Sequence, residues 1–365
     1  MHKISESHRI GDGLISGALS VVLGVCSLLA VLCYLFPSYL TTTELRAAYD
    51  AVFLQSVLKY GMYASLLLGV VTFLINKRKR LGSIGIMLTL LAYVSGGWMV
   101  PVGPVEPYEY ALGLDWMILA FLASAVLFIF LERIFPHRPE QVILRPDWGV
   151  DFSYFVFNHL LISILLLITN RFSEGLFGWA VHDDFQSWVQ SVPVWLQVVA
   201  LIFASDFVLY WNHRAFHEFP RLWKFHAVHH STEHLDWMSG SRSHLVYMVA
   251  ERCLVMVPLY LLGASKEALD IYVAIAAFQA VYIHSNMNVS FFGLNNLIVD
   301  ARFHHWHHSS EAEAIDKNYC AHTPLYDWMF GTYYYPKVKW PERYGTVEPL
   351  PKGFWRQFWY PFVKE

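Results

Sequence analysis

The feature that most constrains what this chain can fold into is a concentration of histidines in its C-terminal half. Five histidines lie within the eighteen residues from His213 to His230, and a second cluster, FHHWHH, occupies residues 303–308. Thirteen of the 18 histidines fall between positions 213 and 322, so the enrichment is regional. Neutral imidazole is the commonest biological ligand of transition metals. The pattern therefore predicts a fold that gathers these side chains around metal.

The spacing of the histidines matches one face of a helix. His213 and His217 are four residues apart. Two further groups have the spacing i, i+3, i+4, namely His226, His229 and His230, and His304, His307 and His308. In a helix each group lies on one face. Eight or more imidazoles exceed what one ion can take, so we expect two metal ions; a closed structural zinc site takes four ligands and prefers some thiolate.

Long apolar segments accompany these clusters. The chain of 365 residues is 56% hydrophobic and only 15% charged, which is typical of a polytopic membrane protein. Apolar runs of about 20 residues can cross a bilayer as helices. We expect an all-α, polytopic membrane helix bundle of about eight transmembrane helices with a cytoplasmic, histidine-rich helical cap. The expected spans are residues 14–36, 59–75, 81–100, 112–131, 152–170, 194–211, 245–263 and 268–285.

The charged loops orient this bundle. Basic residues fill positions 77–80, and Arg133, Arg138 and Arg145 lie between the fourth and fifth spans, whereas residues 101–111 contain no Lys or Arg. By the positive-inside rule, both basic loops, both termini and both histidine clusters then face the cytoplasm. We expect a multi-pass protein, in a bacterial inner membrane in preference to the endoplasmic reticulum. The net charge of −3 gives no indication of nucleic-acid binding.

One acidic residue lies inside an expected span close to the histidines. Asp206 precedes His213 by seven residues, about two helical turns down the same face. A carboxylate there is a candidate to accept a hydrogen bond from a ligand imidazole and orient it. The alternative is that Asp206 caps a neighbouring helix.

Several motifs together resemble a known superfamily. They are HRAFH at 213–217, HAVHH at 226–230, HSN at 284–286, HHWHH at 304–308, DKNY at 316–319 and DWMFGTY at 327–333. The series resembles the fatty acid hydroxylase / sterol desaturase superfamily of integral-membrane, non-haem di-iron oxygenases, over about residues 145–335. The resemblance implies that the metal ligands are His213, His217, His226, His229, His230, His304, His307 and His308, with His284 as a ninth position and His244 as a tenth.

The resemblance also implies a division of the chain and a set of partners. Residues 1–144 form an N-terminal transmembrane region of undefined role, 145–335 the catalytic region, and 336–365 an aromatic and proline-rich tail along the membrane surface. The cofactors are two iron ions, with O2 as co-substrate. The substrate is a lipid in the membrane. Because the chain has no haem, flavin or iron–sulfur motif, electrons come from a separate ferredoxin or cytochrome-type partner with its reductase.

The residues leave the reaction open. Hydroxylation of an acyl chain, a sterol-like lipid or a lipid headgroup is the preferred reading, while desaturation and methyl or ether-bond oxidation use the same histidine scaffold. A different class, a histidine-rich membrane metal transporter or sensor, usually has its histidines in a low-complexity loop or in the middle of a span. Neither arrangement is present here, so we expect an enzyme.

Overall fold

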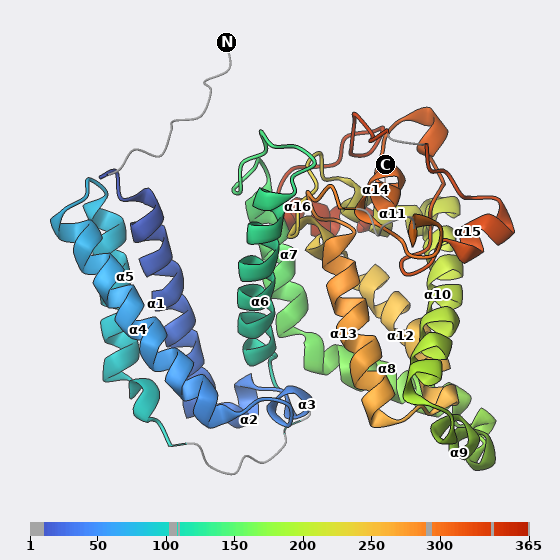
Figure 1. The fold of residues 1–365 in the computed structure, drawn as a ribbon, viewed down its shortest axis with the longest axis horizontal. Helices are drawn as coiled ribbons and strands as arrows, with labels where there is room; N and C mark the ends of the chain where they lie inside the picture. Colours follow the sequence, from blue (N-terminus) through green and yellow to red (C-terminus); the bar gives the residue numbers. More distant parts are fainter. Residues whose placement is uncertain (1–10, 102–107, 109, 290–293, 337–338, 364–365) are drawn as a thin grey trace. The chain divides into compact units, whose positions relative to one another are not determined.

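The computed structural model describes residues 11–101, 108, 110–289, 294–336 and 339–363. Within these residues the regular structure is helical and contains no strand, apart from two isolated bridges, Pro136 with Met287 and Ser309 with Tyr344 (Figure 1). The chain divides into two compact units, Met1–Phe121 with His159–Ile164, and Leu122–Asn158 with Leu165–Glu365. The expected all-α class is confirmed.

The first unit is built around three long helices. They are α1 (Leu14–Leu35), α4 (Ala51–Leu74) and α5 (Lys79–Val94), with the short helices α2 (Pro37–Leu40) and α3 (Thr43–Arg46) between α1 and α4. Small residues let the long helices approach closely, since a Cβ on Gly85 would lie 2.0 Å from Oγ of Ser20. Ser20 and Ser65 also exchange hydroxyl-to-carbonyl hydrogen bonds, each of 2.8 Å, between α1 and α4.

The second unit contains the histidine clusters. Its long helices α10, α12 and α13 run side by side, and α11 and α14 lie at one end of them (Figure 1). Leu201 of α10 and Ala268 of α13 are fully buried where these helices pack. The helices after α6 (Leu114–Ile134) are α7 (Trp148–Leu160), α8 (Ile162–Phe177), α9 (Asp183–Ser191), α10 (Val194–Glu218), α11 (Pro220–His230), α12 (Leu245–Leu262), α13 (Lys266–Tyr282), α14 (Ala301–His307), α15 (Leu325–Phe330) and α16 (Phe354–Trp359).

Six described helices are long and apolar enough to cross a membrane. They are α1, α4, α5 extended to Met99, α6, α10 and α12. The span expected at 152–170 is the pair α7 and α8, which are bent by 56° at their junction and give a seventh crossing if they act as one. The span expected at 268–285 is α13, which has 17 residues and is shorter than the six. The multi-pass membrane class is therefore confirmed.

Candidate metal centre

Three helices and one turn deliver the clustered histidines. His213 and His217 lie in the last turns of α10, and His284 lies just after α13. α11 carries His226, His229 and His230; α14 carries His304 and His307, with His308 at its C-cap. All nine side chains are buried. The structure thus brings together nine of the ten expected positions.

The nine imidazoles form two separate groups, each with ligand atoms within 4.8 Å of one another. The first group is His213, His217, His226, His230 and His307, and the second is His229, His284, His304 and His308. Each i, i+3, i+4 triad is therefore split between the groups. α11 contributes two members to the first group and one to the second, and α14 does the reverse.

The distances between ring nitrogens fit ligands of a shared ion. In the first group the Nε2 atom of His226 lies 2.9 Å from that of His213 and 3.2 Å from that of His230. In the second group the Nε2 atom of His284 lies 3.1 Å from that of His229 and 3.0 Å from that of His304. Two imidazole nitrogens bonded at right angles to one metal at about 2.1 Å are separated by about 3 Å.

In the second group, hydrogen bonds show which ring nitrogen of His229 and of His284 carries the proton. Nδ1 of His229 donates to the Arg242 carbonyl at 3.1 Å, and Nδ1 of His284 donates to the Ala280 carbonyl at 2.7 Å. A neutral imidazole that donates from Nδ1 has a lone pair on Nε2, so two lone pairs face each other at 3.1 Å. Burial lowers the pKa of His284 to about 4 and that of His229 well below 6.5, which disfavours a proton between them. A metal cation fits this site.

The first group also contains buried ring nitrogens that are free to bind a metal. Nε2 of His217 and Nε2 of His307 are buried and have no hydrogen-bond partner among the described residues. Their Nδ1 atoms bond outward, to Asp316 Oδ1 at 3.3 Å and to the Lys317 carbonyl at 2.8 Å. Outward bonds of this kind fix the tautomer that presents Nε2 to a metal. Both groups could therefore hold a metal ion.

His244 does not join either group, so its expected role as a tenth ligand is wrong. It is the N-cap of α12, where Nδ1 accepts from the Val246 N–H at 3.1 Å. Its Nε2 donates to the Phe358 carbonyl at 3.0 Å. Both ring nitrogens are thus occupied by the backbone.

Asp206 also has a different role from the preferred expectation. Its fully buried carboxylate accepts hydrogen bonds from the N–H groups of Ala321, His322 and Thr323 at 2.9–3.0 Å. Seven residues of helix separate it from His213 by about 10 Å along the axis, too far for a direct hydrogen bond. The alternative expectation, a capping role, is closer to the structure, although Asp206 caps a loop and not a helix.

Sequence reasoning gave the charged residues behind His229 no role in the metal centre. Arg242, whose carbonyl accepts from His229, contacts Asp151 through its guanidinium. Asp151 also pairs with Arg145 at 2.6 Å, and Arg145 pairs with Asp236 at 2.9 Å. All four are buried, so the network fixes the loop that carries the Arg242 carbonyl. The charged residue Arg242 within GSRSH (240–244), close in sequence to a histidine cluster, was an available indication.

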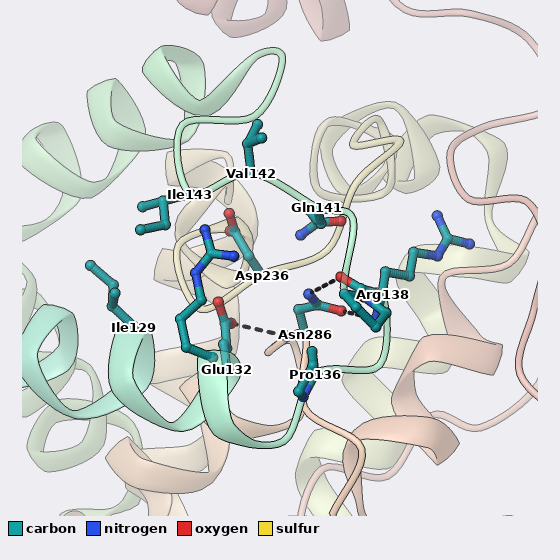
Figure 2. Close-up of a pocket in the computed structure, with 11 residues that line it drawn as sticks. Ile129, Glu132, Pro136, Arg138, Gln141, Val142, Ile143, Asp236 and Asn286 are labelled. Carbon is teal, nitrogen blue, oxygen red and sulfur yellow. Dashed lines mark hydrogen bonds between the residues drawn. The ribbon is translucent and has the colours of Figure 1, made fainter. Parts of the chain in front are cut away.

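A pocket of about 130 Å³ lies beside the turn that follows His284. Figure 2 shows Glu132 and Asn286 facing this pocket. Glu132 Oε1 accepts from the N–H groups of Trp237 and Asn286 at 2.8 and 2.9 Å. Arg133 also lines the pocket. The apolar part of the wall is formed by Ile129, Pro136, Pro139, Val142 and Ile143.

The fold and the site together define a class. This is a multi-pass membrane protein with a buried, two-part centre of neutral imidazoles that could hold metal. Comparison with known proteins narrows the class, because residues 198–332 match the fatty acid hydroxylase family. These residues include all nine clustered histidines. The chain is therefore similar to this family over 135 of its 365 residues.

The relatives are enzymes of lipid oxidation and related chemistry. An ornithine lipid hydroxylase from Rhizobium tropici is 27% identical over 268 residues, covering 72% of this chain and 80% of that protein. An alkylglycerol monooxygenase from Danio rerio is 29% identical over 174 residues, 46% of this chain and 37% of that protein. A very-long-chain aldehyde decarbonylase from Oryza sativa subsp. japonica is 25% identical over 256 residues, 65% of this chain and 37% of that protein. No solved structure matches. These similarities support a membrane lipid hydroxylase, an oxygen-dependent oxidoreductase.

Proposed function

We propose that the chain is a di-iron oxygenase that hydroxylates a membrane lipid with O2 and two externally supplied electrons. The observation that carries this proposal is the pair of imidazole groups with buried, uncompensated Nε2 atoms, within the part of the chain that matches the family. Nine ligands exceed what one ion takes, which supports two ions. Bound iron would supply the oxidising power needed to break an unactivated C–H bond.

The chain's own residues prepare the site for this chemistry. The nine histidines are buried among helices, which keeps bulk water away from the reacting atoms. Neutral ligands leave the charge of the metal largely uncompensated. Because each Nδ1 that donates outward is held by a carbonyl or carboxylate, the Nε2 atoms keep their directions without metal present.

We propose an amino lipid as the substrate. The Rhizobium relative is an ornithine lipid hydroxylase, and this chain covers 80% of it. The pocket beside the turn that follows His284 is lined by the carboxyl groups of Glu132 and Asp236, the guanidinium groups of Arg133 and Arg138, and an apolar wall. A carboxylate and a guanidinium together suit a zwitterionic headgroup, while the apolar wall suits the start of its chains.

The electron source and the orientation are further parts of the proposal. A ferredoxin or cytochrome-type partner would deliver electrons from the cytoplasm to a site at the cytoplasmic face of a bacterial inner membrane. Residues 145–335 would form the catalytic region, flanked by the N-terminal transmembrane region 1–144 and the surface tail 336–365. Single cysteines at Arg78 and Tyr110 are expected to label from opposite sides of the membrane. Labelling of both from one side would contradict this topology.

Metal analysis and lipid mass spectrometry test the function. Protein purified after iron-replete expression is expected to contain about two irons per chain, and cells with the gene should contain a lipid with one extra oxygen atom. His213→Ala should abolish that product. His244→Asn is the matched control, because asparagine can cap α12 and His244 binds no metal in the proposed centre. Less than one metal per chain, or a lipid profile unaffected by both deletion and His213→Ala, would refute the proposal.

A further inference from the structure

One short segment contacts three ligands of the same metal position. Asp316, Lys317, Asn318 and Tyr319 follow the α14 cluster, and we call them the 316–319 strap. His217 donates to the Asp316 carboxylate at 3.3 Å. His307 donates to the Lys317 carbonyl and His213 to the Tyr319 carbonyl, both at 2.8 Å. All three histidines belong to the five-histidine group.

The backbone of the strap has an unusual conformation that accounts for this reach. Asp316 and Asn318 have φ angles of 56° and 62°, in the left-handed region that asparagine and aspartate tolerate better than other non-glycine residues. Each of them directly precedes a residue whose carbonyl accepts from a ligand. Left-handed residues of this kind persist only where the surroundings hold them.

The surroundings do hold the strap. The buried Asn318 side chain donates to the carbonyls of Phe303 and Tyr334 at 3.0 and 2.7 Å and accepts from the Tyr334 N–H at 2.8 Å. The buried Asp327 carboxylate accepts from the N–H groups of Tyr319 and Cys320, each at 2.8 Å. The strap is therefore fixed from both sides before it meets the histidines.

The four-histidine group is supported differently. His229 and His284 bond to the carbonyls of Arg242 and Ala280, which lie outside the strap. The Nδ1 atoms of His304 and His308 have no hydrogen-bond partner among the described residues. A change in the strap should therefore act on one metal position and not on the other.

We propose that the 316–319 strap is the positioning element of the five-histidine metal position, and that Asp316 and Asn318 are its positioning residues. This inference rests on the proposed function only in requiring that both groups bind metal. The strap aligns three Nε2 atoms through their outward hydrogen bonds. The strap also reaches solvent, because the side chain of Asp316 is 52% exposed.

The test measures metal retention, with ferrous iron as the probe. Metal-free protein in detergent is loaded with Fe²⁺ under anaerobic conditions, and loss of iron to a coloured chelator is followed with time. Asp316→Ala and Asn318→Gly are expected to speed the loss of one of two equivalents by about 10-fold or more, with the other unchanged, as outer-ligand substitutions typically weaken metal binding by 10–100-fold. Asp316→Asn, which retains an oxygen acceptor and the left-handed preference, should be intermediate.

The control is Glu313→Ala, an exposed substitution three residues before the strap. Thermal unfolding of the metal-free variants separates a positioning effect from misfolding, and Asp316→Ala is expected to unfold within a few degrees of the parent protein. Loss of both equivalents at a common faster rate, or retention equal to that of Glu313→Ala, would overturn the inference while leaving the metal centre intact. Failure of the parent protein to take up iron would overturn the proposed function as well.

Discussion

Because the lone pairs of His229 and His284 face each other, we expect replacement of His284 to stabilise the metal-free protein and to destabilise the iron-bound protein. Replacing His284 with Phe keeps a ring against Gly240 and removes both nitrogens. In the metal-free protein, the change removes the Nδ1 hydrogen bond of 2.7 Å to Ala280, which contributes about 0.5–1.5 kcal/mol. It also removes the contact between the lone pairs of His229 and His284 at 3.1 Å. In the parent protein, a buried acceptor that is left unsatisfied costs about 1–3 kcal/mol, and the variant is relieved of this cost.

The second effect is the larger one, so metal-free His284→Phe is expected to be more stable than the parent by about 1 kcal/mol. For a chain of 365 residues, that is a rise of roughly 1–2 °C in the unfolding midpoint. With iron the order should reverse, because the parent gains binding free energy that the variant loses in part. Thermal unfolding in detergent, with and without Fe²⁺, measures both.

His305→Phe is the matched control for this prediction. His305 is also buried in the α14 cluster, but its Nδ1 bonds to the Tyr344 hydroxyl at 2.8 Å and its Nε2 to the Ser285 carbonyl at 3.0 Å. Its replacement removes two satisfied hydrogen bonds, so it should destabilise both forms. If metal-free His284→Phe were instead destabilised as much as His305→Phe, the two Nε2 atoms would be sharing a proton, and the argument for a required metal would fail.

Three further predictions concern the supporting groups. Asp206→Asn replaces one acceptor oxygen of the carboxylate with a donor, so at least one of the three N–H groups loses its partner. We expect a loss of about 2–4 kcal/mol in unfolding free energy. An unchanged unfolding midpoint would contradict this prediction. Asp151→Asn weakens the buried contacts to Arg145 and Arg242 and should lower the unfolding free energy by about 3–5 kcal/mol in the same assay. As a control, Asp270→Asn at the exposed pair with Lys266 should lower it by less than about 1 kcal/mol. Burial lowers the pKa of His284 from 6.5 to about 4, so the unfolded chain takes up a proton at this residue before the folded protein does. The unfolding free energy of the metal-free protein should therefore fall as the pH drops from 6.5 toward 4, and an unfolding midpoint that rises over this range would contradict it.

Part of this molecule follows from sequence alone. The apolar runs predicted the membrane class, and helical spacing predicted eight of the nine clustered histidines, because both depend on local periodicity. The ninth, His284, came from the family resemblance. Spacing did not predict which triad member joins which group, since that depends on how α10, α11 and α14 pack. His244 was misassigned because its Nε2 bonds to Phe358, a contact across 114 residues that no local pattern contains.

The same limit applies to the carboxylates. Asp206 lies on the predicted face of α10, yet its partners are in the loop 321–323, which is remote in sequence. Asp316 was within a quoted motif, but its role depends on a left-handed backbone that tertiary contacts impose. Local pattern identified most of the clustered histidines, and only the folded chain identified what holds them.

The division of each triad between the two groups restricts how this sequence can change. One residue advances a helix by about 100°, so inserting or deleting a single residue within HAVHH or HHWHH would turn some of its imidazoles away from both groups at once. A point substitution inside these motifs changes one side chain, whereas a change of length displaces several imidazoles together. During divergence of related chains, gaps should therefore accumulate in the connections between α12, α13 and α14 and be excluded from the five-residue windows at 226–230 and 304–308.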